Sequence, residues 1–123
     1  MQNALTSLSL LGGQLLVNLT RVPEAHEWSQ LRAELLTHLD SGRVSGVILD
    51  LAQAEILDEL DLKEVLATRS TIQLMGLPMV LCGLQPAVVH AWTRSVDLPA
   101  DLVGYASVQD ALEALDTRPA WGR

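Results

Sequence analysis

The sequence predicts an α/β fold in which an N-terminal β-hairpin is followed by β-α-β units that form a mixed sheet with packed helices. Three observations support this prediction. Two short alternating segments flank the Gly12-Gly13 pair, which suits a tight hairpin turn. Two uninterrupted apolar runs, Gly46–Leu51 and Met79–Cys82, have the length of buried strands. Segments with apolar residues at helical spacing separate these runs, and such strand–helix–strand units favour parallel pairing.

The expected hairpin consists of strands at Thr6–Leu10 and Leu15–Leu19, because apolar side chains alternate along both segments. Pro23 then begins the first helix, since its missing N–H would have no partner in the first turn anyway. Ser41-Gly42 ends this helix. Its apolar stripe at helical spacing contains Trp28, Leu31, Leu35 and Leu39, which are expected in the core.

The second helix follows the strand at Gly46–Leu51 and is expected from about Asp58 to Met75, with Gly76 ending it. Asp58 is a favourable N-cap residue. Asp61 occupies the third helical position, from which an acidic side chain can bond back to the cap. The local sequence therefore specifies where this helix begins.

The C-terminal part of the chain continues the alternation of strands and helices. Met79–Cys82 is the next strand, and Pro86 opens a helix that runs to about Ser95. A last strand is expected at Leu102–Tyr105, and Ser107 caps the final helix. The apolar face of that helix consists of Val108, Ala111, Leu112 and Leu115.

Length and composition limit the class of protein. With 123 residues the chain makes one domain, expected at residues 1–116 and followed by a loose tail at 117–123 that contains Trp121. Its net charge is −7, and Lys63 is its only lysine. This balance argues against binding of nucleic acid and against electrostatic docking to an anionic membrane. The single cysteine, Cys82, excludes an internal disulfide and suits a reducing cytosol, so we expect a cytoplasmic protein.

One uncharged stretch, Ser70–Thr93, is long enough to cross a bilayer. Two glycines and two prolines divide it into a helix end, a short buried strand and a helix start. No membrane insertion is therefore expected.

No residue pattern predicts catalysis, a cofactor or a metal site. The chain lacks a glycine-rich phosphate loop. His26, His38 and His90 are expected on different helices, with no spacing that suits metal ligands. Cys82 lies within an apolar run, where free cysteine behaves as a small hydrophobic residue. The chain is therefore expected not to be an enzyme.

Two loops are expected at the carboxyl ends of parallel strands, where open α/β sheets usually meet ligands and partners. One runs from Ala52 into Glu59, and the other is Gly83–Pro86. The first loop and the following helix start are acidic, with Asp50, Glu55, Asp58, Glu59, Asp61 and Glu64. Either the acids simply complement a helix N-terminus, or they form a docking face for a basic partner surface. A magnesium or calcium site fits less well, because no ligand spacing is present.

These residues together resemble the STAS domain family, the fold of sulfate transporters and anti-sigma-factor antagonists. The resemblance extends from about Ala4 to Leu115 and is strongest to the small stressosome proteins. The matching segments are GVILDL at Gly46–Leu51, LD at Leu57-Asp58, LMG at Leu74–Gly76 and VLCGLQPAVV at Val80–Val89. The Gly-x-x-Pro turn within the last segment is the most specific. The resemblance implies a STAS-like fold and a non-catalytic signalling protein of a stressosome or partner-switching system.

The resemblance also implies two positions for phosphorylation by a serine/threonine switch kinase. In the family, the first acceptor directly follows an aspartate at the start of the second helix. Here Asp58 is followed by Glu59, and the second acceptor position is Cys82, so neither position can accept phosphate from such a kinase. Glu59 is either a built-in mimic of the phosphorylated state or an ordinary first-turn acid that remained when the switch was lost. Thr68, Ser70 and Thr71 are further candidate acceptors.

The partners implied by the resemblance are the switch kinase and related STAS proteins, within a homo-oligomer or a larger assembly. The expected partner-binding residues are Asp58, Glu59, Asp61, Leu62, Lys63, Gly83, Leu84, Gln85 and Pro86. Two alternatives remain open. The chain could be a STAS accessory subunit of a lipid-transport ATP-binding-cassette system, or a sensor that holds a nucleotide or a fatty acid at the strand-end rim.

Overall fold

A computed structural model of the chain describes residues 5–55, 57–94 and 98–116. Its five strands form one sheet in the order β1-β2-β3-β4-β5, with β1 antiparallel to β2 and all other neighbours parallel. The elements along the chain are β1 (Thr6–Leu11), β2 (Gln14–Leu19), α1 (Ala25–Leu39), β3 (Gly46–Asp50), α2 (Glu59–Leu74), β4 (Met79–Cys82), α3 (Pro86–Trp92), β5 (Gly104–Tyr105) and α4 (Val108–Asp116). The predicted fold class and order of elements are confirmed.

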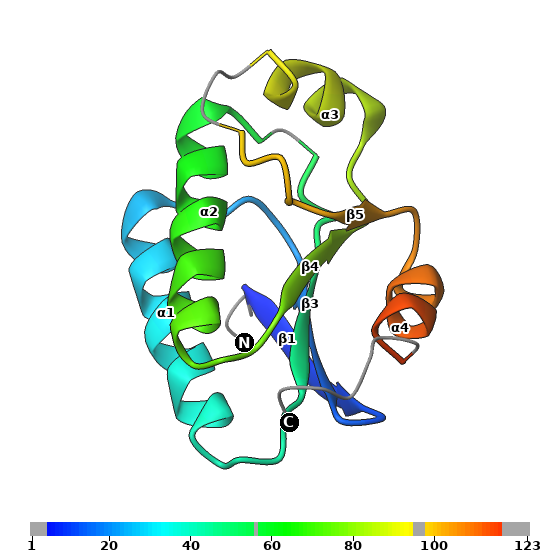
Figure 1. Cartoon of the computed structure of the whole chain (residues 1–123). Coiled ribbons are helices and arrows are strands. Elements are labelled where there is room, and N and C mark those ends of the chain that lie inside the picture. The colour runs from blue at the N-terminus through cyan, green and yellow to red at the C-terminus, as the bar shows by residue number, and fades with distance from the viewer. Residues whose placement is uncertain (1–4, 56, 95–97, 117–123) are drawn as a thin grey trace.

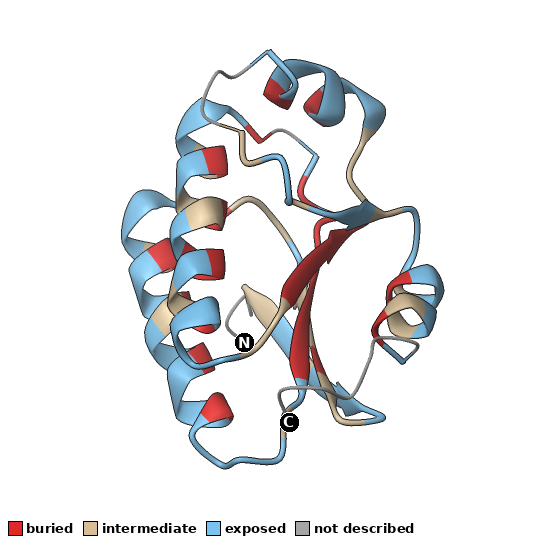
Figure 2. Cartoon of the chain, viewed as in Figure 1, coloured by how far each residue is buried: buried red, intermediate tan, exposed pale blue. Residues whose placement is uncertain are grey.

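The helices cover the sheet unequally. In Figure 1, α1 and α2 lie side by side on one face, α4 lies on the other, and α3 lies beyond one end of the strands. A large apolar core fills the space between the sheet and the α1–α2 layer, and Figure 2 shows the buried sides of these helices turned toward the strands. A smaller core beneath α4 contains Ile48, Val80, Cys82, Ala111 and Leu115. Because β3 and β4 have apolar cover on both faces, all their residues are buried, which explains their uninterrupted apolar sequences.

Three predicted boundaries need correction. The first helix begins at Ala25 rather than in a turn opened by Pro23, because Glu24 is its N-cap and exchanges capping hydrogen bonds with Glu27. The last strand is shorter than predicted, because the N–H of Leu102 bonds to the carbonyl of Pro99 in a turn and only Gly104–Tyr105 remain paired. The third helix ends at Trp92, and its predicted end near Ser95 lies outside the described residues, as do the tail and Trp121.

The uncharged stretch Ser70–Thr93 contains the end of α2, all of β4 and α3, as its glycines and prolines predicted. Among the helices in the described residues, none is both long and apolar enough to span a membrane.

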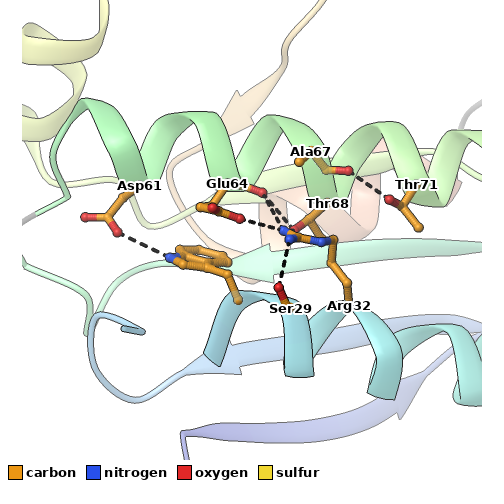
Figure 3. Close-up of polar contacts among 8 residues, drawn as sticks. Ser29, Arg32, Asp61, Glu64, Ala67, Thr68 and Thr71 are labelled. Carbon is orange, nitrogen blue, oxygen red and sulfur yellow. Dashed lines mark hydrogen bonds and ion pairs between the residues drawn. The ribbon is translucent and has the colours of Figure 1, made fainter. Parts of the chain in front are cut away.

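Polar contacts between α1 and α2 fix how the two helices face each other. The Arg32 guanidinium on α1 lies 2.8 Å from the Glu64 carboxylate on α2 and 3.4 Å from the Thr68 hydroxyl (Figure 3). Near the start of α2, the indole N–H of Trp28 donates to Asp61 at 3.2 Å. Trp28 is 1% exposed and Trp92 is 3% exposed, so both tryptophans are core residues as predicted.

Candidate functional site

The start of α2 is held by the reciprocal cap that the sequence predicted. The backbone N–H of Asp61 donates to the Asp58 carboxylate at 2.9 Å, and the N–H of Asp58 donates to the Asp61 carboxylate at 3.1 Å. The bond from Asp61 lowers the pKa of Asp58, because it stabilises the charged carboxylate. Burial raises the pKa of Asp61, although Trp28 also donates to that carboxylate. Both aspartates therefore serve the helix itself.

Three neighbouring side chains at the same helix start face solvent instead. Glu59 and Lys63 are exposed, and Leu60 is 69% exposed. We call Asp58, Glu59, Leu60 and Lys63 the α2 N-terminal surface. The Glu59 carboxylate forms no ion pair or side-chain hydrogen bond within the described part of the chain.

Leu62 does not belong to this surface, which corrects the prediction. Its side chain is 1% exposed and packs in the main core. Leu60 is the leucine exposed on this surface, and it was not among the predicted partner-binding residues. Consecutive helical residues point in directions about 100° apart, so Leu60 falls outside the stripe that buries Leu62, Val65 and Ile72. Aligning the buried stripe of the helix on these three residues would have placed Leu60 on the exposed side.

The Gly83–Pro86 turn lies beside the loop that leads toward α2, because β3 and β4 are parallel neighbours. Gly83 has φ +74°, and a Cβ there would lie 2.8 Å from the Asp50 carboxylate and 2.9 Å from the backbone nitrogen of Ala52. The Gln85 amide donates to the carbonyl of Ala52 at 3.0 Å, which joins the two loops directly. The expectation that both loops open on the same rim is confirmed.

The Asp50 side chain stabilises this junction between the two loops. Its carboxylate accepts hydrogen bonds from the Asn18 amide at 2.9 Å and from the backbone N–H of Ala52 at 3.0 Å, and the residue is only 8% exposed. Of the remaining turn residues, Pro86 is exposed at the first position of α3. Leu84 is half-buried and packs against the main core. Contacts with the preceding loop and with the main core therefore hold the turn in place at the rim.

Cys82 lies beneath the sheet face that α4 covers and is completely buried. Burial, with a smaller contribution from Asp50, raises the pKa of its thiol to about 12. A thiol with such a pKa stays protonated at neutral pH and is a poor nucleophile. The Cys82 side chain thus faces the core beneath α4.

The further candidate acceptors on α2 differ in accessibility. Thr68 is completely buried, and its hydroxyl donates to the carbonyl of Glu64 at 2.8 Å (Figure 3). A kinase could not reach it in the folded chain, so the proposal of Thr68 as an acceptor is corrected. Thr71 is half-buried and donates to the carbonyl of Ala67 at 2.9 Å, whereas Ser70 is exposed.

Within the described residues, no group of three or more histidine, cysteine, aspartate or glutamate side chains is arranged to hold a metal ion. His26 and His38 both lie on α1, so the expectation of different helices is wrong for this pair, and the predicted bounds of the first helix already contained both residues. His90 lies on α3, 2.9 Å from the Arg94 guanidinium.

A cavity of about 400 Å³ lies next to the Gly83–Pro86 turn, between α3 and the ends of β4 and β5. Its lining is mainly apolar and consists of Leu81, Leu84, Val89, Trp92, Thr93, Leu98, Leu102, Gly104, Tyr105 and Ala106. Because no arginine or lysine among the described residues lines this cavity, that lining does not suit the phosphates of a nucleotide. An apolar ligand is the better match for the sensor alternative.

Replacing the cap residue is expected to destabilise the protein more than replacing the neighbouring acid. Asp58→Ala should lower the free energy of unfolding by about 1 kcal/mol, because the N–H of Asp61 loses its acceptor. Glu59→Ala should lower it by only about 0.3 kcal/mol, the typical effect of one exposed charge at a helix start. Urea unfolding of both variants beside the wild type measures the difference.

The effect of Asp58→Ala should also depend on pH. The pKa of Asp58 is lower in the folded chain than its ordinary value of 3.8. Its carboxylate therefore stabilises the fold above that value, and the contribution is lost as the pH falls below it. Equal stability of the two variants at neutral pH would contradict the capping role.

Comparisons with known proteins agree with this geometry. A family model described as the STAS domain matches residues 24–111, more than half of the chain. A search of curated protein sequences finds no match. Among solved structures, RsbS from Moorella thermoacetica, in a variant with glutamate in place of a serine, has 22% identity and a TM-score of 0.76, and the match covers 90% of this chain and 94% of that one.

Two further solved structures are similar. A chain from a study of the molecular architecture of the stressosome, described there as a signal integration and transduction hub, has 22% identity and a TM-score of 0.70, with 91% of this chain and all of that one covered. The anti-sigma factor antagonist SpoIIAA in its unphosphorylated form has 15% identity and a TM-score of 0.68, with 92% and 99% covered. Identities this low establish a shared fold.

Proposed function

The chain belongs to the STAS domain family, and from this premise we propose that it is a non-catalytic signalling protein of a stressosome or partner-switching system. It binds related STAS proteins and a serine/threonine switch kinase. The kinase contacts the α2 N-terminal surface and the adjoining Gly83–Pro86 turn. The observation that carries this proposal is the exposed Glu59 carboxylate at the start of α2, directly after the capping Asp58 and without an ion pair to any described residue.

Glu59 supplies a permanent negative charge where the family has a phosphorylatable residue. Unpaired N–H groups and the helix dipole favour negative charge at a helix start, whether from phosphate or from carboxylate. Glutamate has one charge and two oxygens, whereas phosphoserine has about −1.5 to −2 charge and three acceptor oxygens. A kinase surface that recognises the phosphorylated state therefore meets part of the same charge here without any modification.

The cap geometry supports the division of roles between the two neighbouring acids. The Asp58 carboxylate is committed to the N–H of Asp61, so it cannot turn outward without loss of the cap. Glu59 has no such commitment and can pair with a basic partner group. Leu60, 69% exposed beside it, offers an apolar contact next to this charge.

Glu59→Ser tests the proposal directly. The full-length wild-type protein first captures its kinase from a native lysate, and the purified kinase then acts on purified wild type and variants. We expect Glu59→Ser to incorporate about one phosphate per chain at the substituted position, because the variant restores a hydroxyl acceptor after Asp58. Wild type should incorporate no phosphate at position 59. The matched surface variant Glu113→Ser on α4 should incorporate none at position 113. Intact-mass and peptide mass spectrometry measure both.

Kinase affinity provides the second readout. Replacement of Glu59 by serine should change the affinity of the unphosphorylated protein for the kinase by about tenfold or more, equivalent to about 1.4 kcal/mol. Capture of no kinase, or unchanged affinity together with no phosphorylation of Glu59→Ser, would reject the proposal. Recovery of a permease with its ATPase would favour the transport alternative instead.

A further inference from the structure

The strand β1 forms one edge of the sheet, and within the described residues β2 is its only strand neighbour. An edge strand presents a row of unpaired backbone N–H and C=O groups that can pair with another strand. The strand β1 is six residues long, from Thr6 to Leu11, whereas β5, the strand at the opposite edge of the sheet, has two residues.

The register of the hairpin shows which residues carry the free groups. In an antiparallel pair, opposite residues alternate between hydrogen-bonded and non-hydrogen-bonded positions. The N–H of Thr20 donates to the carbonyl of Leu5 at 2.8 Å, so the Leu5–Thr20 pair is hydrogen-bonded. The pairs of Ser7, Ser9 and Leu11 share this phase. The backbone groups of the alternate residues, Thr6, Leu8 and Leu10, therefore point away from β2.

The sequence of β1 lacks two features by which proteins often protect an exposed edge strand, charged side chains and proline. The segment TSLSLL contains no charged residue and no proline. Leu10 is 51% exposed, and with Leu8, Leu15 and Val44 it forms the apolar part of a groove of about 350 Å³ beside the edge, whose lining also includes His38 and Arg43. The chain as a whole carries a charge of −7. Along β1 itself, two copies can therefore meet without direct repulsion between like charges of the paired strands.

We propose that β1 pairs with β1 of a second copy of this chain, antiparallel about a two-fold axis at Leu8, so that the two sheets become one. Two identical strand edges can pair with each other in antiparallel orientation, so the same edge serves both copies, as an isologous contact requires. In this register Leu8 faces Leu8 of the second copy, and Thr6 faces Leu10. The free groups of these residues form up to about six intermolecular hydrogen bonds. The exposed Leu10 side chains pack beside the Leu8 pair.

The interface extends the self-association expected under the proposed function, but it rests on backbone geometry alone. The β1 edge lies at the opposite end of the strand order from β4 and β5, and the Gly83–Pro86 turn follows β4. A second copy bound at β1 therefore leaves the Gly83–Pro86 turn open to a partner. An experiment can therefore reject the β1 contact without rejecting the kinase contact at the turn, and the reverse also holds.

Amide hydrogen exchange of the full chain, followed by NMR at several protein concentrations, tests the pairing without any mutation. The amides of Ser7, Ser9 and Leu11 should be protected at all concentrations, because they bond to β2. The amides of Thr6, Leu8 and Leu10 should gain at least about tenfold protection as the concentration rises and the dimer forms. A dimer in which these three amides stay unprotected would overturn the proposal.

Sedimentation analysis of a matched pair of variants gives an independent result. Wild type and Leu60→Lys should have twice the 13.3 kDa chain mass at about 100 μM, whereas Leu10→Lys should have the mass of a monomer. Both substitutions place lysine at an exposed leucine, but only Leu10 lies on the proposed edge. A monomeric wild type, or a Leu10→Lys dimer of undiminished affinity, would overturn the proposal. Protection of the Thr6, Leu8 and Leu10 amides only after addition of a different protein would do the same.

Discussion

Replacement of Gly83 by alanine is expected to lower the free energy of unfolding by about 3 kcal/mol or more. Two effects add at this position. The backbone has φ +74°, where a side chain is unfavourable, and a Cβ would lie 2.8 to 2.9 Å from Asp50 and Ala52. These neighbours cannot simply move aside, because the Asp50 carboxylate holds Asn18 and the N–H of Ala52. The junction between the two loops would have to separate.

Gly76→Ala is the matched control for this prediction. Gly76 has a similar φ of +82°, but a Cβ there would meet no atom within 4 Å. This variant should therefore show only the backbone penalty of about 1 kcal/mol. Urea unfolding of the two variants measures the difference, and equal destabilisation would contradict a close approach at Gly83. Gly83→Ala should also weaken the kinase contact of the proposed function, whereas Gly76→Ala should not.

Replacement of Trp28 by alanine should be at least as destabilising, by about 3–5 kcal/mol. Its side chain is 1% exposed in the main core, and its indole N–H donates to Asp61 at the start of α2. Trp28→Phe keeps most of the apolar volume but removes the donor. It should cost about 1–2 kcal/mol, because the half-buried Asp61 carboxylate loses one of its hydrogen bonds.

A double-mutant cycle separates the two roles of Trp28. Trp28→Phe, Asp61→Ala and the double variant are compared with wild type by urea unfolding. A coupling energy of about 1 kcal/mol would show that the hydrogen bond links α1 to the cap of α2. If the coupling is absent, packing alone explains the position.

Local sequence signals predicted the features that depend on residues close together in the chain. The cap formed by Asp58 and Asp61 spans one helical turn, and the Gly12-Gly13 hairpin needs two residues with positive φ. The apolar runs at β3 and β4 indicated strands covered on both faces. In the candidate site, the same signals correctly located the start of α2 and the loops that meet at the rim.

The errors have different physical origins. Leu62 was expected on the surface and Thr68 among accessible hydroxyls, yet both are buried. Thr68 is covered because Arg32, 36 residues earlier, reaches across from α1. The sequence near Thr68 contains no sign of this contact. The Pro23 start failed for a different reason, since the Glu24–Glu27 cap competes locally and begins α1 two residues later.

By itself, the sequence determined the order of elements, the cap of α2 and the glycine turn, because these depend on backbone preferences and spacing within short segments. The STAS family was indicated by the resemblance of a few short segments to that family, and the family model over residues 24–111 confirmed it. Only the tertiary structure decided which side of α2 faces α1, that Cys82 lies beneath α4, and that Asp50 and Ala52 leave no space for a side chain at Gly83. Burial and close contact are set by groups that folding brings together from distant segments. The exposed Glu59 carboxylate depends on both levels. The sequence placed it directly after Asp58, and the packing of α2 decided that it faces solvent.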